Sequence, residues 1–121
     1  MGFKESLTAI CTALPETFTV TLMDHDGISV DSVESTQSDI DVNAYFVEMT
    51  GVFTQAVRTA EQMQTGAVNE LVLKSEKITA VLRPVGDSYY LVLAMTPNGN
   101  TGKARYLLRV AAPRLLQELG A

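Results

Sequence analysis

The sequence predicts an α+β domain in which helices cover an antiparallel β-sheet. Three apolar runs rich in strand-forming residues follow one another at 71–74, 78–84 and 89–95, with only short polar turns between them. This spacing is typical of an antiparallel meander. The runs are almost continuously apolar, which indicates that both faces of the sheet are covered. Long amphipathic helix patterns before and after the meander can supply that cover.

The composition is that of a soluble globular protein. A chain of 121 residues is expected to form one domain, 1–121, and its hydrophobic fraction of 46% and charged fraction of 19% are ordinary. No apolar run approaches the ~20 residues of a membrane-spanning helix, and the first residues do not resemble a secretory signal. Cys11 is the only cysteine, so no internal disulfide is possible, and we expect a cytoplasmic location.

Charge is distributed unevenly along the chain, although the formal net charge is only −5. Between Lys4 and Arg58 there are nine acidic residues and no lysine or arginine. The last predicted helix reverses the sign with Lys103, Arg105, Arg109 and Arg114. An acidic half repels phosphates, so nucleic acid is not an expected partner. The acidic stretch is either ordinary solvated surface or a patch that attracts a basic partner protein.

The chain begins with a predicted helix and two strands. Phe3–Leu14 places its apolar residues at helical spacing, and Pro15 ends the helix. Thr17–Met23 alternates between apolar residues and threonines. This predicts a strand with one drier face, which contains Phe18, Val20 and Leu22, and one wetter face, which contains Thr17, Thr19 and Thr21. Asp24 to Gly27 supply a turn, and 28–33 return as a second strand.

The longest predicted helix runs from Val42 to Thr65. Ser38, Asp39 and Asp41 are all suitable N-caps, and Gly66 is a suitable terminator. The apolar side chains that we expect to pack on the sheet fall in one arc of the helical wheel: Val42, Tyr45, Phe46, Met49, Val52, Phe53, Ala56, Val57, Ala60 and Met63.

The opposite side of this helix is less polar than a solvated surface usually is. Its row consists of Ala44, Val47, Gly51 and Thr54, and Arg58 closes it. A glycine inside a helix costs about 1 kcal/mol relative to alanine. Either a second helix approaches closely at Gly51 and offsets this cost, or the glycine is a chance surface residue.

The last helix is predicted over Thr101–Leu119, after a turn at 96–100. Ala104, Leu107, Leu108, Ala111, Leu115 and Leu119 form its buried stripe, and Pro113 predicts a kink. The segment Gly99–Lys103 resembles the end of a phosphate-binding loop. It lacks the first glycine and the hydroxyl residue after the lysine, so helix capping explains it better.

The sequence contains no catalytic constellation. His25 is the only histidine, and Asp24 and Asp26 lack the rest of a calcium-binding loop, so a hairpin turn explains them. Cys11 lies on the buried stripe of the first helix, where burial should raise its pKa and lower its reactivity. Arg83 can reach a partner or pair with a local carboxylate such as Asp87. We therefore expect no catalytic residues, no metal site, no cofactor and no enzymatic activity.

Three stretches together resemble the Roadblock / dynein light chain family. The first is Leu71–Met95, the meander itself, and especially Leu82–Leu93 within it. The second is Leu22–Gly27, where the family also has an aspartate–glycine turn, and the third is Asn100–Tyr106, at the start of the last helix. The resemblance covers nearly the whole chain and agrees with the predicted order of elements.

This resemblance implies a specific fold and assembly. The five strands would form an antiparallel sheet in the order 2-1-5-4-3, with the long helix on one face and the terminal helices on the other. The third strand and the long helix would pair with a second copy to form a homodimer. The expected dimer residues are Val47, Gly51, Thr54, Arg58, Asn69 and Leu71.

The resemblance also implies a partner. Bacterial members similar to this chain regulate Ras-like small GTPases, in some cases as activators without an arginine finger. The implied function is thus a homodimeric scaffold that binds such a GTPase, and the expected partner-binding residues are Glu48, Gln55, Arg58 and Gln62. The alternative is an assembly or adaptor module for a motor, receptor or polarity complex, with no effect on nucleotide state.

Overall fold

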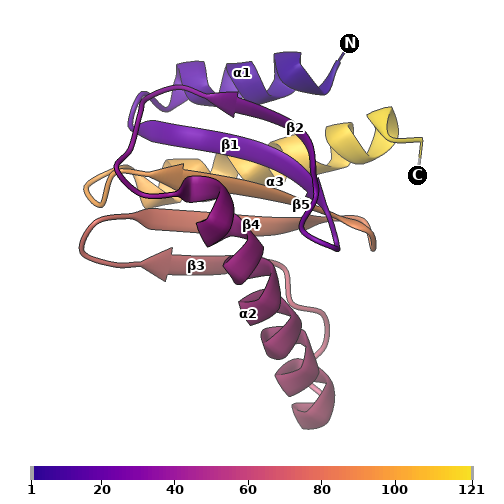
Figure 1. Ribbon diagram of the computed structural model, residues 1–121. Helices are drawn as coiled ribbons and strands as arrows, with labels where there is room; N and C mark the ends of the chain where they lie inside the picture. Colours follow the sequence, from indigo (N-terminus) through magenta and orange to yellow (C-terminus); the bar gives the residue numbers. More distant parts are fainter. Residues whose placement is uncertain (1, 121) are drawn as a thin grey trace.

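The computed structural model describes residues 2–120 and shows the predicted order of elements (Figure 1). The elements are α1 (Phe3–Ala13), β1 (Thr17–Asp24), β2 (Ser29–Glu34), α2 (Val42–Met63), β3 (Leu71–Lys74), β4 (Thr79–Val85), β5 (Tyr89–Met95) and α3 (Thr101–Glu118). The five strands form one antiparallel sheet in the order β2-β1-β5-β4-β3. The fold implied by the family resemblance is therefore confirmed, and β2 and β3 are its edge strands.

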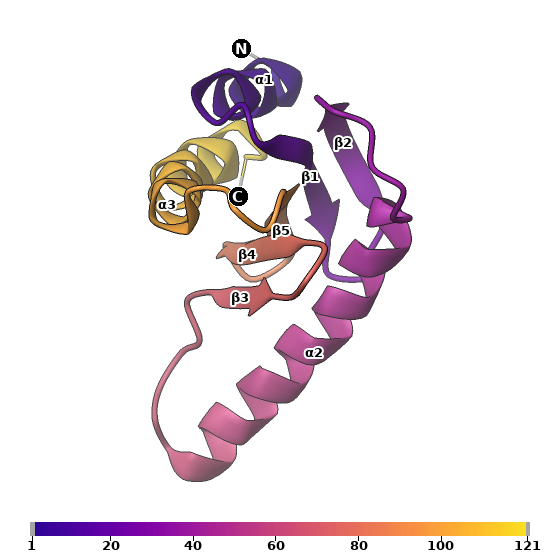
Figure 2. The ribbon, with the colours of Figure 1, turned by 90° about the vertical axis from the view of Figure 1, so that its left-hand side faces the viewer.

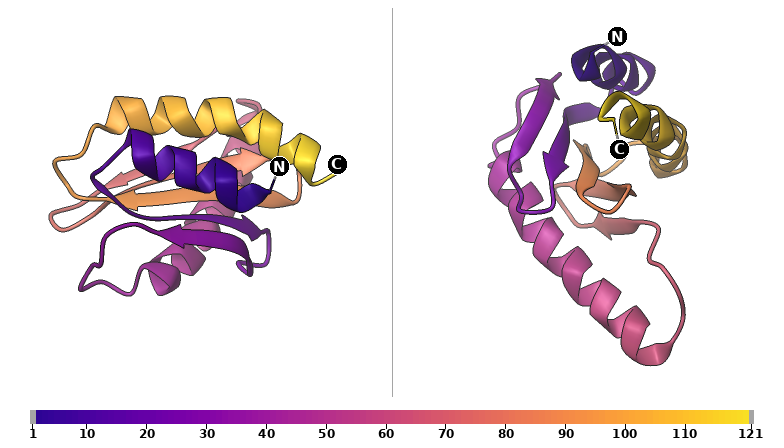
Figure 3. Two further views of the ribbon diagram at one scale, coloured as in Figure 1. Left: turned by 90° about the horizontal axis from the view of Figure 1, so that it is seen from above. Right: turned by 90° about the vertical axis from the view of Figure 1, so that its right-hand side faces the viewer.

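Helices lie on both faces of the sheet. The two terminal helices, α1 and α3, lie side by side on one face, and α2 crosses the other (Figures 2 and 3). Each face has its own hydrophobic cluster: Leu7, Leu108 and Leu115 belong to the first, and Phe46, Met49 and Phe53 to the second. Strands β4 and β5 are buried along most of their length, which confirms the prediction that both faces are covered.

The first strand departs from the predicted alternation because it contains a bulge. Thr17 pairs with Met95 and Thr19 with Ala94, so Phe18 is an extra residue in the ladder. Phe18 packs against the α2-side cluster, whereas Val20 and Leu22 belong to the opposite one. Placing Phe18 on one face with Val20 and Leu22 was therefore wrong, and a bulge has no signal in the alternation itself.

The expected wetter face of this strand is also buried. Thr17, Thr19 and Thr21 have exposed fractions of 0%, 5% and 1%. One of these hydroxyls has a partner on the neighbouring strand, since Thr21 Oγ1 lies 2.8 Å from Ser32 Oγ. Threonine fits position 21 because its hydroxyl can hydrogen-bond while its methyl group packs on the pleated surface.

Helix α2 has the predicted cap at its N-terminus but not at its C-terminus. Asp41 is the N-cap, and its carboxylate accepts a hydrogen bond from the backbone N–H of Ala44 at 3.1 Å. At the other end the helix is terminated two residues before the expected Gly66, at Gln64. Gln64 adopts φ 56°, and the N–H of Thr65 donates to the carbonyl of Ala60. Gly66 also has positive φ, but it lies outside the helix.

The second half of α2 extends beyond the edge of the sheet at β3 (Figures 1 and 2). Two members of the predicted buried arc are wrong, for different reasons: Met63 is 69% exposed and Val52 is 46% exposed. Met63 lies in the last turn, where no strand is available beneath the helix. Val52 lies on the flank of the helix, one residue before the buried Phe53. Helical periodicity predicts a shared face, but it carries no information on where the sheet ends.

The last helix is capped by Asn100, whose side-chain oxygen accepts a hydrogen bond from the N–H of Lys103 at 3.0 Å. This confirms helix capping as the role of that segment. Pro113 lies inside α3, and the helix continues to Glu118. Among residues 2–120, no helix has both the length and the apolar character needed to cross a membrane.

Candidate functional site

The outer row of α2 is fully open in this chain. Val47, Gly51, Thr54 and Arg58 are all exposed, as the helical periodicity predicted. A Cβ atom placed on Gly51 would have no other atom within 4 Å, so nothing in the described chain offsets the cost of this glycine. Val47, although 48% exposed, lies against the turn at Gly27. The row is therefore an exposed surface whose two central residues, Gly51 and Thr54, are small.

Strand β3 presents the second open feature. It pairs on one side with β4 and forms an edge of the sheet on the other. An edge strand has a row of backbone N–H and C=O groups directed away from the sheet, which can pair with another strand. Asn69 is exposed in the segment that leads into this strand, while the side chain of Leu71 is half-buried against the α2-side cluster. The side chain of Leu71 is thus only partly available to a partner.

The residues expected to bind a partner form a second row on α2. Glu48, Gln55, Arg58 and Gln62 are all exposed, and Arg58 belongs to both rows. Their spacing of three, four or seven residues places them on one side of the helix. This row runs beside the first one and continues into the projecting half of α2.

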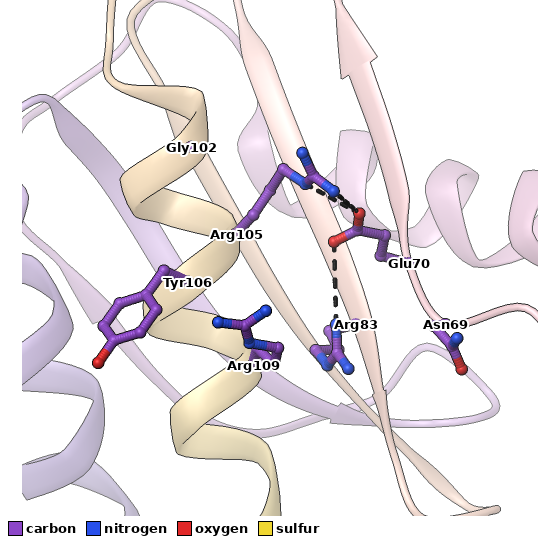
Figure 4. A pocket seen from close by; sticks show the side chains of 7 residues that line it. All are labelled: Asn69, Glu70, Arg83, Gly102, Arg105, Tyr106 and Arg109. Atoms are coloured by element: carbon purple, nitrogen blue, oxygen red, sulfur yellow. Dashed lines mark hydrogen bonds and ion pairs between the residues drawn. The ribbon is translucent and has the colours of Figure 1, made fainter.

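A cluster of charged side chains joins the segment before β3 to α3 (Figure 4). Nε of Arg105 donates to Glu70 Oε2 at 2.8 Å, and Nη2 of Arg105 donates to the same oxygen. Arg83 Nη1 lies 3.8 Å from Glu70 Oε1. The hydrogen bonds from Arg105 hold the pKa of the Glu70 carboxyl below its usual range, and the positive charges of Arg105, Arg83 and Arg109 act in the same direction.

This cluster corrects the expectation for Arg83. The local carboxylate considered for it was Asp87, but the structure pairs Arg83 with Glu70. Glu70 and Arg105 are 35 residues apart in the sequence. No local pattern links such residues, so only the folded chain brings them together.

The turn between β1 and β2 has the hairpin chemistry that was predicted. Asp24 Oδ1 accepts hydrogen bonds from the backbone N–H groups of Asp26 and Ile28, and Gly27 has a φ of 84°. His25 and Asp26 are both exposed. Among residues 2–120 there is no group of three or more metal-ligating side chains.

The thiol of Cys11 also has the environment that was predicted. Its side chain lies in the hydrophobic cluster beneath α1 and is 8% exposed. This burial raises the pKa of the Cys11 thiol and keeps it in the unreactive protonated form.

Comparison with known proteins gives matches among solved structures. MglC from Myxococcus xanthus is 39% identical in sequence, with 98% of this chain and 99% of that chain covered and a TM-score of 0.69. A Roadblock/LC7 domain from Streptomyces avermitilis has a TM-score of 0.85 at 11% identity, with 100% of both chains covered. MglB in a tetrameric arrangement has a TM-score of 0.84 at 16% identity, with 94% of this chain and 85% of that chain covered.

The three matches carry different information. The first combines substantial identity with coverage of both whole chains. The other two have low identity and show a shared fold alone. No protein-family model matches the chain, and a comparison with curated proteins gave no match either.

Proposed function

Since the chain belongs to the Roadblock family, together with MglC, we propose that it is a homodimeric, non-enzymatic scaffold that binds and regulates a Ras-like small GTPase. The observation that carries this proposal is the combination of an open edge at β3 with a helix α2 that projects past that same edge (Figure 2). We take residues 1–121 as one functional domain. We also place the protein in the cytoplasm, where its single buried thiol would remain reduced.

A two-fold axis beside β3 would use both open features at once. The β3 strands of two copies would pair, and the two sheets would become continuous. The projecting half of each α2 would then lie over the sheet of the other copy. This arrangement would cover the exposed apolar side chains of Val52 and Met63. It would also bring the two α2 rows together at Gly51, where the absence of a side chain allows close approach.

The GTPase would bind to the face that carries both α2 helices. The row Glu48, Gln55, Arg58 and Gln62 is exposed beside the expected dimer contact. The family resemblance implies activation without an arginine finger, and the row contains one arginine, Arg58, which forms no ion pair among residues 2–120. We therefore assign the scaffold no donated catalytic group. It would act by ordering the GTPase's own switch segments, which is sufficient to change the rate of hydrolysis.

The test is a titration of the purified protein with a Ras-like small GTPase encoded in the same genome. The GTPase is loaded with a non-hydrolysable GTP analogue in one arm and with GDP in the other, and Kd is measured by calorimetry. A regulator must distinguish the two states, and coupling of this kind typically amounts to at least about fivefold in affinity. Glu48→Lys should slow association, whereas Glu76→Lys, an exposed control in the β3–β4 turn, should not.

The outcomes separate the proposed functions. Preference for one nucleotide state supports regulation of a GTPase. Equal affinity for both states would remove nucleotide-state regulation and leave an adaptor that only anchors the GTPase. Absence of binding to either state would contradict the GTPase proposal.

A further inference from the structure

The outer surface of α3 has the opposite charge to the rest of the chain. The whole sequence has nine lysines and arginines against fourteen acidic residues. Helix α3 contains four of those nine cations and only one of the fourteen acidic residues, Glu118. Lys103, Arg105, Arg109 and Arg114 are all exposed. An acidic protein thus presents one basic face.

Part of this face is hollowed. A cavity of about 350 Å³, which we call the basic hollow, is lined by Asn69, Glu70, Arg83, Gly102, Arg105, Tyr106 and Arg109 (Figure 4). Its three guanidinium groups face a single carboxylate, Glu70, which is already shared by Arg83 and Arg105. Within residues 2–120, Arg109 forms no ion pair, and its guanidinium carbon lies 5.5 Å from the ring centre of Tyr106. The basic hollow therefore retains an excess of positive charge.

An apolar groove lies next to the basic hollow. It has a volume of about 130 Å³, runs between α1 and α3, and is lined by Ser6, Ala9, Ile10, Tyr106, Leu107, Val110, Ala111 and Arg114. Tyr106 is 54% exposed and Val110 is 45% exposed. Tyr106 lines both the groove and the basic hollow, so the two form one continuous surface.

We infer that this surface is a docking site for an acidic segment of a partner protein that carries apolar anchor residues. The groove would bind the apolar side chains between α1 and α3. The guanidinium groups of Arg105 and Arg109 would bind the carboxylates, for which their planar geometry suits paired hydrogen bonds. Charge complementarity selects this occupant, because a basic or neutral segment would leave the excess positive charge of the basic hollow unpaired.

The same features argue against the other possible occupants. An anionic membrane is broad and flat, whereas Ile10 and Leu107 line a groove that only one or two side chains can fill. The remainder of the chain is acidic and would be repelled by such a membrane. A second copy of this chain is already expected at β3 and α2, on the opposite face of the sheet. The docking surface therefore lies mostly apart from the proposed dimer and GTPase contacts, and Asn69, at the β3 end of the basic hollow, is the one expected dimer residue that lines it.

The inference is tested with peptides selected for binding. A random-peptide phage library is panned against the wild-type protein, with counter-selection against Val110→Asp. A selected peptide is then synthesised with a fluorophore, and its Kd is measured by fluorescence anisotropy. We expect the selected peptides to combine apolar residues with aspartate or glutamate, and to bind more weakly as ionic strength rises.

Four variants locate the binding site. Arg109→Glu and Val110→Asp should each weaken binding by about tenfold or more, because they remove a charge partner and an apolar contact. Two further variants make the same kinds of substitution, basic to acidic and apolar to acidic, away from the docking surface. They are Lys77→Glu in the β3–β4 turn and Ile28→Asp before β2, where the side chain is 63% exposed. These two controls should leave Kd within about twofold. Circular dichroism and light scattering confirm that each variant keeps its fold and mass.

Several results would overturn the inference. They are the absence of enriched peptides, enrichment of peptides without acidic residues, and binding that Val110→Asp does not weaken. Binding to vesicles of phosphatidylserine and phosphatidylcholine that depends on Arg109 would assign the surface to a membrane instead. A rise in mass at high protein concentration that Arg109→Glu abolishes would assign it to a second copy.

Discussion

At the scale of single residues, Gln64 has an unfavourable backbone conformation. It is the only non-glycine residue among residues 2–120 with a positive φ, at 56°. In this left-handed region the side chain of an L-residue approaches its own backbone, which costs about 1 kcal/mol or more. Gln64 is also exposed, so no side-chain packing offsets that cost. The helix must nevertheless end there, because the following segment has to return to the sheet.

Gln64→Gly should therefore stabilise the protein by about 0.5–1 kcal/mol, since glycine adopts the left-handed conformation without steric cost. The measurement is the free energy of unfolding from urea denaturation. Glu61→Gly is the matched control: it lies one turn earlier at a helical position and should destabilise by about 1 kcal/mol. If both glycines destabilise equally, the helix does not end at Gln64 in solution.

At the scale of elements, Glu70 joins the segment before β3 to α3. Its carboxylate accepts hydrogen bonds from Arg105 and lies 3.8 Å from Arg83 on β4. The edge strand is short and pairs with one neighbour only, so this contact is a second attachment between β3 and the rest of the domain. The pKa of Glu70 is lowered mainly by the hydrogen bonds from Arg105.

This lowered pKa predicts a pH dependence of stability. A carboxyl group whose pKa is lower in the folded state stabilises the fold above its unfolded pKa, and the contribution is lost as pH falls through the folded pKa. Glu70→Gln should thus be less stable than wild type at neutral pH, and the difference should shrink as pH falls below about 4. The measurement is the urea midpoint of wild type and of Glu70→Gln at a series of pH values between neutral and below about 4.

The exposed Glu76, which has no ion pair among residues 2–120, provides the control, since Glu76→Gln should show no such pH-dependent difference. A constant difference for Glu70→Gln at all pH values would show that its charge is not what stabilises β3.

Sequence patterns predict the features of these elements that depend on local residues, and miss those that depend on contacts between distant segments. Helix and strand positions follow from periodicity, because each pattern is local, and the exposed row Val47–Arg58 followed in the same way. The bulge at Phe18 was missed, because it depends on the ladder formed with β5. The contact of Glu70 with Arg105 was missed because it joins distant segments. A signal did exist for the docking surface: Tyr106 and Val110, four residues apart, lie beside Arg105 and Arg109 at the same spacing.

At the scale of the whole molecule, the proposed dimer can be tested at Gly51. Gly51→Glu should convert the dimer to a monomer, because it places a charged side chain where the two α2 helices would meet. Gly51→Ala is the milder change: it has open space in the single chain and should gain up to about 1 kcal/mol of helix stability, but its methyl group would occupy the space that close helix approach needs, so the dimer should dissociate more readily than wild type. Size-exclusion chromatography with light scattering gives the masses, and circular dichroism reports the fold. A monomeric wild type, or a Gly51→Glu variant that stays dimeric, would contradict the proposed interface.

The projecting half of α2 has a consequence for how long the protein survives. An isolated helix shorter than ~12–15 residues is marginal in water, and the part of α2 beyond β3 has no strand beneath it (Figure 2). In a separated monomer this part would unwind often and expose backbone to proteases, whereas in the dimer the partner's sheet would protect it. The half-life of the protein in a cell would then follow its concentration, because dilution produces the cleavable monomer and accumulation produces the protected dimer.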